Sequence, residues 1–401
     1  MINKPCTKSV GFLSTYPPSE CGLATFTEDL VRSLNVHPVM HTKVIAVLEH
    51  QDELLSDATD FSLFKHERSS YIQAAQWANA SLDLLVIEHE YGIFGGECGE
   101  YILDLVKTLT IPFVITTHTV LLSPSLKQQL ILSQAGNLST NVITMAESSI
   151  SILASTYGID IKKIVFIPHG VPGITTQSRN QLKAIYSLQQ KTVISSFGLI
   201  SPAKGLEYGI KAISKLTSDH PNLLYLILGK THPSVKEING ESYRQQLINL
   251  SQRLGIKKNV HFIDKYLTKE EIMAYLGLSD AYLTPYLSKE QAVSGTLAYA
   301  MGCGRVIIST PYRYAQEMLG NGRGLLAKFK DAASIAACIQ TVLEHPMQKK
   351  RMENKTLAIG KTMLWSNVAQ KYADLFGNIL KTTQRESSEV AAINQSEMQV
   401  E

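Results

Sequence analysis

Carboxylate and imidazole side chains stand where apolar segments end in the first half of the chain. Glu88, His89 and Glu90 close one apolar run and precede a glycine-rich turn, and His118 follows the next run. Such groups can bind the hydroxyls of an acceptor, anchor a loop or ligate a metal ion. Because neighbouring strand residues point to opposite faces, Glu88 and Glu90 share a side while His89 faces away. Three metal ligands therefore do not converge, and a structural role for His118 stays open.

Groups suited to binding an anion occur in both halves. Gly22 lies in a polar loop before a helix, where a glycine lets a ligand approach the backbone. Lys204 supplies a positive charge, and the segment 294–296 opens a helix whose free N–H groups favour a phosphate. Taken singly, an ordinary strand–helix turn and a surface lysine explain Gly22 and Lys204 as well. The first loop is not a dinucleotide-binding fingerprint, because it contains a single glycine.

A scaffold must bring these strand ends together. Apolar, β-branched runs recur along the chain, each followed by an amphipathic segment: 10–14, 43–48, 84–88, 113–117, 142–145, 164–167, 193–199, 224–228, 260–263, 281–284, 306–309 and 325–327. Continuous apolar strands predict parallel sheets covered on both faces. The alternation of strands and helices predicts an α/β protein with two doubly wound parallel-sheet domains. Thr268 is the expected cap of a helix at 267–278.

The domain limits follow from composition. We expect a first Rossmann-like domain at 1–172, a linker with a short helix at 173–190 and a second Rossmann-like domain at 191–360. An apolar helical pattern follows at 361–382, and the polar segment 383–401 predicts a disordered tail.

Charge, cysteine content and the absence of long apolar segments argue against several classes of protein. The 401 residues include 38 basic and 35 acidic side chains, a net charge of +3, which does not favour nucleic acid. Five cysteines without a C-x-x-C motif indicate neither a disulfide framework nor a zinc site. We find no signal peptide and no apolar segment long enough to cross a membrane, so we expect a cytoplasmic protein. The basic group 349–355 is expected on a solvated helix face, and a peripheral contact with the inner face of a membrane stays open.

Six sequence blocks in a fixed order carry a family resemblance. They are CGLATF at 21–26, HEYGIFGG at 89–96, THT at 117–119, IPHGV at 167–171, FGLISPAKG at 197–205 and SGTLAYAMGCG at 294–304. Together they resemble the group 1 retaining glycosyltransferases of sequence family 4. The resemblance implies the GT-B fold, in which two Rossmann-like domains face each other across a cleft and the last helix crosses back to the first domain.

The resemblance also implies roles for particular residues. It assigns catalysis to His118, Lys204 and Gln291. The acceptor-side role expected for Glu88, His89 and Glu90 comes instead from their residue types and the turn that follows them. The resemblance assigns donor binding to Gly22, Gly198, Lys204, Ile263, Gln291, Ser294, Gly295, Thr296 and Tyr299. No cofactor or metal ion is expected, since the segment Asp-x-Asp is absent. His169, where the family usually has Asn, is expected mainly to stabilise a turn.

The chain departs from the family pattern at three positions. Leu199 replaces a phosphate-binding arginine, and Gln291 and Tyr299 replace the two glutamates of a Glu-x7-Glu pair. These changes put in question the recognition of the donor ribose and part of the rate of glycosyl transfer. The family implies transfer of a hexose from a nucleotide-sugar, with GDP-mannose favoured and UDP-glucose next, to a sugar-containing acceptor that the sequence leaves open, lipid-linked sugars included. A phosphorylase of the same fold and a catalytically silent nucleotide-sugar-binding protein are the alternatives, and the oligomeric state is open.

Overall fold

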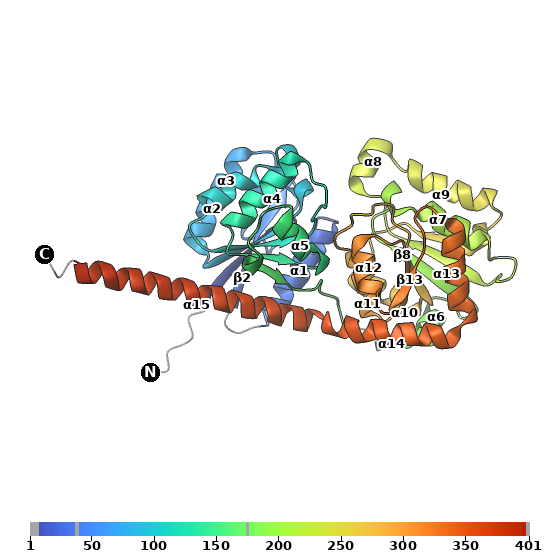
Figure 1. The fold of residues 1–401 in the computed structure, drawn as a ribbon. Helices are drawn as coiled ribbons and strands as arrows, with labels where there is room; N and C mark the ends of the chain where they lie inside the picture. Colours follow the sequence, from blue (N-terminus) through green and yellow to red (C-terminus); the bar gives the residue numbers. More distant parts are fainter. Residues whose placement is uncertain (1–7, 37–39, 174–175, 398–401) are drawn as a thin grey trace. The chain divides into compact units, whose positions relative to one another are not determined.

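The chain divides into two compact domains (Figure 1). The computed structural model describes residues 8–36, 40–173 and 176–397, with side chains described to residue 385. The first domain combines Met1–Gly170 with Trp365–Glu401, and the second is Val171–Leu364. The first domain thus ends at Gly170, where we expected residue 172.

Seven parallel strands form the sheet of the first domain, in the order β3-β2-β1-β4-β5-β6-β7. They are β1 (Lys8–Ser14), β2 (Met40–Leu48), β3 (Phe61–Phe64), β4 (Leu84–His89), β5 (Phe113–Thr117), β6 (Asn141–Thr144) and β7 (Ile164–Phe166). The sequence analysis missed β3, a short edge strand whose Phe61 and Phe64 are only half-buried. The inner strands β4 and β5 are buried along their whole length, which explains their uninterrupted apolar character.

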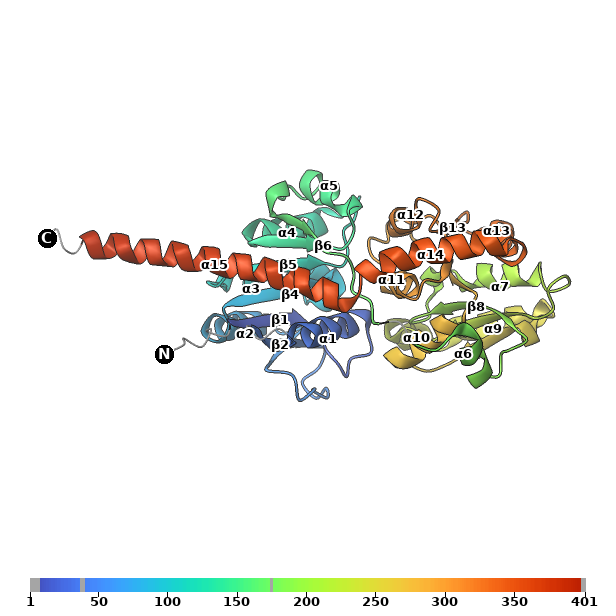
Figure 2. The ribbon, with the colours of Figure 1, turned by 90° about the horizontal axis from the view of Figure 1, so that it is seen from below.

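Helices cover both faces of this sheet (Figure 2). Helices α2 (Arg68–Ser81), α3 (Ile102–Thr108) and α4 (Leu126–Leu138) pack on one face through a cluster that includes Leu13, Ile87 and Ile115. On the opposite face lie α1 (Gly22–Leu34) and α15 (Trp365–Glu397), which contact each other. The first domain also contains α5 (Ser148–Ser155) and the short 3-10 turns η1 (Tyr91–Ile93), η2 (Glu97–Gly99) and η3 (Ile161–Lys163).

Helix α15 corrects the expected C-terminal tail. We predicted a disordered segment from residue 383, but the helix continues to Glu397. A formed helix extends with one hydrogen bond per added residue, and this segment is rich in Glu, Gln and Ala, which favour helices. Residues 398–401 of the expected tail lie outside the described residues.

The second domain is built on six parallel strands in the order β10-β9-β8-β11-β12-β13. They are β8 (Thr192–Phe197), β9 (Leu223–Leu228), β10 (Val260–Ile263), β11 (Ala281–Thr284), β12 (Val306–Ser309) and β13 (Gly324–Leu326). Its helices are α6 (Arg179–Ile185), α7 (Leu206–Ser214), α8 (Pro233–Asn239), α9 (Ser242–Arg253), α10 (Lys269–Leu278), α11 (Gly295–Gly302), α12 (Arg313–Leu319), α13 (Ala332–Glu344) and α14 (Pro346–Thr362), with the turns η4 (Pro202–Lys204) and η5 (Lys257–Asn259). The expected linker is therefore largely part of this domain, because α6 packs against α10 through Leu182. Residues 174–175 of that linker lie outside the described residues.

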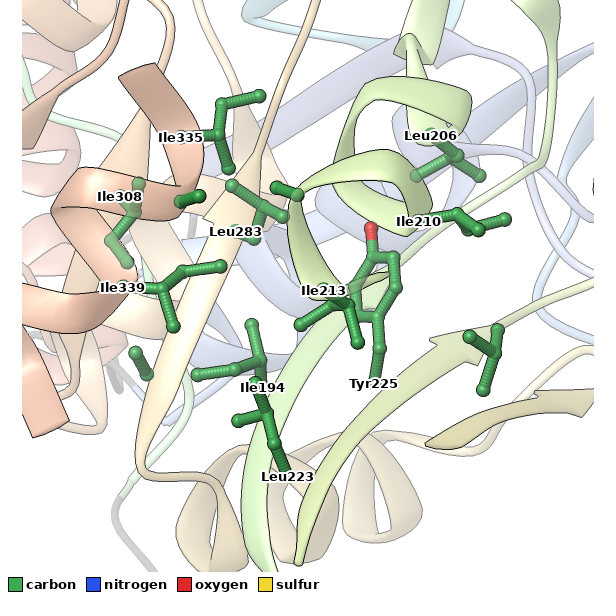
Figure 3. Close-up of a cluster of buried hydrophobic side chains, with 14 of the residues drawn as sticks. Ile194, Leu206, Ile210, Ile213, Leu223, Tyr225, Leu283, Ile308, Ile335 and Ile339 are labelled. Carbon is green, nitrogen blue, oxygen red and sulfur yellow. The ribbon is translucent and has the colours of Figure 1, made fainter. Parts of the chain in front are cut away.

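A cluster of mostly aliphatic side chains, together with Tyr225 and Tyr243, fills the larger core of the second domain, and Figure 3 shows part of it. Tyr225 is fully buried next to Ile210 and Ile213 of α7. Its hydroxyl lies 2.8 Å from Ser196 Oγ, so the polar end of the ring is satisfied inside the core. This packing holds α7 against the strands whose carboxyl ends carry the candidate site.

Helix α10 begins where the sequence predicts. Thr268 caps α10 in a capping box with Glu271. Of the helices in the described part of the chain, none combines the length and apolar character needed to cross a membrane.

Candidate active site

A glycine-bounded loop at the carboxyl end of β8 positions Lys204. Gly198 has φ 122° and Gly205 has φ 61°, conformations that side chains other than glycine rarely adopt. A Cβ at Gly205 would lie 2.3 Å from the Pro285 carbonyl oxygen, so the loop packs closely on the segment after β11. Lys204 ends the 3-10 turn between these glycines.

Lys204 supplies the charged group of a mostly apolar pocket. The lining residues come from β8, β9, β11 and the loops that follow them: Ser196, Phe197, Gly198, Leu199, Ile200, Lys204, Leu206, Ile227, Leu228, Tyr282 and Tyr286. Leu199, at the position where the resemblance expects an arginine, is part of this lining. The pocket therefore carries one ammonium group rather than two positive charges.

Tyr286 joins Lys204 to the start of α11. The Lys204 Nζ lies 4.0 Å from the centre of the Tyr286 ring. The Tyr286 hydroxyl lies 2.8 Å from Thr296 Oγ1, which is in turn 3.2 Å from Ser294 Oγ. Burial alone would raise the pKa of Tyr286, but the Lys204 charge and the hydrogen bonds around its hydroxyl lower that pKa below its usual value.

The N-terminus of α11 faces this group of hydroxyls. Ser294 caps the helix by accepting a hydrogen bond from Leu297 N at 3.3 Å, while Gly295 and Thr296 form its first turn. The first backbone N–H groups of a helix carry partial positive charge and lack partners within the helix. Together with Lys204, they form a site suited to a phosphate group. Gly198, Lys204, Ser294, Gly295 and Thr296, all predicted from the sequence, thus lie in one region of the second domain.

The three other predicted donor residues of the second domain are placed differently. Gln291 is exposed, and its side-chain Nε2 donates to the Val293 carbonyl at 2.7 Å. Tyr299 is buried on α11, with its ring 6.2 Å from that of Phe197. Ile263 ends β10 and packs half-buried against the smaller core cluster of this domain. Tyr299 therefore presents little surface for ribose recognition.

In the first domain, the loop after β1 leads into α1 at Gly22. The Cys21 Sγ caps the helix by accepting a hydrogen bond from Ala24 N at 3.3 Å. A Cβ built at Gly22 meets no atom within 4 Å, and the φ of this glycine is not in the left-handed region. The fold itself does not require glycine there, and the open space agrees with the predicted approach of a ligand.

The burial of Glu88 and His89 disagrees with the acceptor-side role that we expected for the segment 88–90. Glu88 and His89 are 0% and 1% exposed, so neither side chain reaches a surface where an acceptor could bind. His89 packs against Tyr91 and Phe94, and burial lowers its pKa to about 4. Glu90 is half-buried and accepts a hydrogen bond from the Thr119 hydroxyl. The alternation of side chains along β4 sends Glu88 and His89 into the two opposite core layers.

Glu88 instead bonds His118. The His118 Nε2 lies 2.8 Å from Glu88 Oε2, and the His118 side chain is 9% exposed while that of Glu88 is wholly buried. The sequence analysis proposed both residues but not this pair. Glu88 lies near the carboxyl end of β4 and His118 follows β5, so the pairing of these two strands in the sheet brings the residues together.

The Phe26 ring of α1 packs against three other aromatic rings. Its ring centre lies 4.9 Å from that of His118, 5.1 Å from that of His169 and 5.2 Å from that of Trp365. His169 is buried, its Nδ1 donates to the Gly170 carbonyl at 2.7 Å, and burial lowers its pKa to about 4. A neutral His169 that bonds its own turn agrees with the structural role expected for it. Among the described residues, no group of three or more His, Cys, Asp or Glu side chains is arranged to hold a metal ion.

Comparisons with known proteins show which proteins this chain resembles. Residues 178–358 match the family model described as "Glycosyl transferases group 1". HepE from Anabaena, solved with UDP and glucose, superposes with a TM-score of 0.74 at 16% identity, covering 92% of this chain and 100% of that chain. Sucrose-phosphate synthase from Thermosynechococcus elongatus gives a TM-score of 0.77 at 14% identity, with 94% and 100% covered. The second domain of this chain thus resembles the group 1 glycosyl transferases, and the chain has the GT-B fold.

A curated relative matches this chain over most of both lengths. The D-inositol 3-phosphate glycosyltransferase of Corynebacterium efficiens is 24% identical over 311 residues, which span 72% of this chain and 70% of that protein. The family model covers the region that contains Lys204, Tyr286 and the start of α11, so the candidate anion site lies within the matched segment.

Proposed function

We propose that this protein is a glycosyl transferase that moves a hexose from a nucleotide-sugar to an acceptor hydroxyl with retention of anomeric configuration. The observation that carries the proposal is the placement of Lys204 beside the hydroxyls and free N–H groups at the start of α11. A nucleoside diphosphate leaves with growing negative charge, and donors fixed where that charge develops lower the barrier. Lys204 and the segment 294–296 are the groups proposed to do so.

The proposed chemistry needs no carboxylate base. As in the family resemblance, the acceptor attacks from the face that the leaving group occupies, and the departing phosphate oxygen takes the acceptor proton. His118 would hold a hydroxyl of the donor hexose, and Gln291, whose amide can both donate and accept, would contact the same sugar. We further propose that transfer is independent of metal ions, so that added EDTA leaves the rate unchanged.

Two nucleotide-sugars are the first donors to test. The sequence motifs favour GDP-mannose, while the solved complex of HepE with UDP and glucose supports UDP-glucose. For the acceptor, we propose a sugar or polyol hydroxyl, supported by the inositol phosphate named for the curated relative. Lipid-linked sugars are a further acceptor class to test.

A donor screen tests the proposal. Thermal shift with GDP, UDP and ADP identifies the nucleotide, and the hydrolysis of matching nucleotide-sugars is then followed by release of the nucleoside diphosphate. We expect one nucleotide to raise the melting temperature and its sugar conjugate to be hydrolysed slowly without acceptor. Nucleotide binding without any turnover would indicate a silent binder, and dependence on inorganic phosphate would indicate a phosphorylase.

A further inference from the structure

The buried pair of Glu88 and His118 has the geometry of a carboxylate that orients an imidazole. Glu88 is the penultimate residue of β4, and His118 follows β5, the neighbouring strand in the sheet. The His118 N–H donates to the neighbouring strand at the His89 carbonyl, 3.0 Å away, which fixes its backbone. The ring is fixed by the 2.8 Å contact of Nε2 with Glu88 Oε2 and by the edge of Phe26.

This contact decides which ring nitrogen carries the proton. A carboxylate only accepts hydrogen bonds, so Nε2 must be the nitrogen that donates to Glu88. Nδ1 is then the nitrogen left for another partner, and the described residues provide no hydrogen-bond partner for it. In a neutral ring with the proton on Nε2, Nδ1 can accept a hydrogen bond from a hydroxyl group.

The surroundings of Glu88 point to a role beyond packing. A buried carboxylate costs free energy unless it is fully hydrogen-bonded. Yet Glu88 Oε1 has no partner in the described part of the chain, and neither does the nearby buried Ser14 Oγ. Glu88 pairs with Thr116 across the sheet, and the negative charge of Glu88 contributes to the raised pKa of Tyr372 on α15. Such unsatisfied buried groups accompany functional sites more often than inert cores.

We propose that Glu88 is a positioning residue that fixes the tautomer and orientation of His118, so that Nδ1 accepts a hydrogen bond from a hydroxyl of the bound sugar. The proposal rests on the proposed function only in naming the sugar as the partner of Nδ1. The pair itself is a property of the first domain and can be tested without substrate. Tyr372 of α15 lies close enough for the charge of Glu88 to act on its hydroxyl.

The first arm of the test reads the imidazole directly. Nitrogen NMR of imidazole-labelled protein, with the His118 signal assigned by His118→Gln, reports which nitrogen carries the proton. We expect the Nε2–H form in the unaltered protein, and a shift toward the Nδ1–H form in Glu88→Gln, because the amide N–H of glutamine can donate to Nε2. An unchanged His118 signal in Glu88→Gln would overturn the proposal even if the enzyme is inactive on every donor.

The second arm reads turnover with the donor found active. We expect Glu88→Gln to lower kcat by about 10- to 100-fold, the usual effect of losing a group that orients a site residue, with nucleotide affinity unchanged. The double variant Glu88→Gln/His118→Gln should be no slower than His118→Gln alone, because Glu88 acts through His118. Tyr372→Phe should give a smaller loss in kcat than Glu88→Gln.

A matched control separates positioning from stability. Asp29 is also a buried carboxylate of the first domain, and it pairs with Arg32 at 2.8 Å on α1. Asp29→Asn should lower the melting temperature while leaving kcat within about twofold. Equal losses of kcat in Asp29→Asn and Glu88→Gln, or additive losses in the double variant, would show that Glu88 is merely structural.

Discussion

The Lys204 ammonium lies over the face of the Tyr286 ring, 4.0 Å from its centre. This contact sets the position of the Lys204 ammonium group. Lys204 is the single charged side chain of the pocket lining, because Leu199 stands where the family usually has an arginine. The Tyr286 hydroxyl continues the connection to Thr296 at the start of α11. Tyr286 thus aligns the two parts of the proposed diphosphate site.

Substitutions at Tyr286 should separate its ring from its hydroxyl. Tyr286→Phe keeps the ring beneath Lys204, so nucleotide affinity should change by less than about threefold while stability falls by about 1 kcal/mol. Tyr286→Leu removes the ring, and affinity should fall about 3- to 30-fold, equivalent to ~0.7–2 kcal/mol of cation–π attraction. Calorimetric titration with the preferred nucleoside diphosphate measures both. Equal affinities for the two variants would contradict a role for the ring.

Two glycines should respond in opposite ways to alanine. Gly22→Ala adds a methyl group to open space at the start of α1, so the free energy of unfolding should stay equal or rise by up to ~1 kcal/mol. Its transfer rate should nevertheless fall at least about tenfold if a substrate approaches this backbone. Gly205→Ala places a side chain at φ 61° and should cost at least ~1 kcal/mol of stability.

Denaturant unfolding and initial rates measure both glycine variants. The prediction for Gly22 fails if Gly22→Ala transfers sugar at the full rate. Gly205→Ala serves as the control that shows what a structurally required glycine costs.

His89 should make the protein less stable in weak acid. Its pKa is lowered to about 4 in the folded state by burial, against about 6.5 for an unfolded histidine. Between these values the unfolded chain binds more protons, so stability falls as the pH drops below about 6.5. This single group should cost ~1.4 kcal/mol at pH 5.5 relative to pH 8, and His89→Leu should remove that part of the pH dependence. The measurement is urea unfolding at both pH values.

The exposed His50 provides the control for this titration. His50→Leu should leave the difference in unfolding free energy between pH 5.5 and pH 8 unchanged. If His89→Leu shows the same pH dependence as the unaltered protein, the buried imidazole is not the cause. His169, whose pKa is lowered to a similar value, accounts for the dependence that remains in His89→Leu.

Helix α15 should stabilise the first domain through Phe376. This ring is fully buried, 6.3 Å from that of Phe12 on β1. Phe376→Ala should therefore cost about 3–5 kcal/mol. Gln370→Ala, on the exposed side of the same helix, should cost less than ~0.5 kcal/mol. Denaturation followed by circular dichroism compares them, and equal costs would mean that α15 does not pack on the sheet.

The sequence predicted the sheets better than the ends of the chain. Uninterrupted apolar runs located β4, β5 and β9, because strands buried on both faces leave no polar alternation to confuse with a helix. The edge strand β3 was missed, since its half-buried residues carry a weaker pattern. The extension of α15 was missed because a polar segment that continues a formed helix resembles a disordered tail in composition.

The candidate site was predicted in its residues rather than in its contacts. Lys204 and the start of α11 follow from strand ends and helix signals, which are local in the sequence. The contacts of Glu88 with His118 and of Lys204 with Tyr286 join residues far apart in the chain, so no spacing rule reveals them. The acceptor-side prediction for Glu88 and His89 failed because side-chain alternation shows which face a residue takes, but not whether that face is covered.

Product analysis by proton NMR tests the central claim most directly. The enzyme is incubated with UDP-glucose or GDP-mannose and an acceptor, and the anomeric proton of the product is compared with that of the donor. We predict release of the nucleoside diphosphate, a product with the anomeric configuration of the donor, and a loss of at least about 100-fold in Lys204→Ala but not in the exposed control Lys215→Ala. An inverted product, or full activity in Lys204→Ala, would contradict the account.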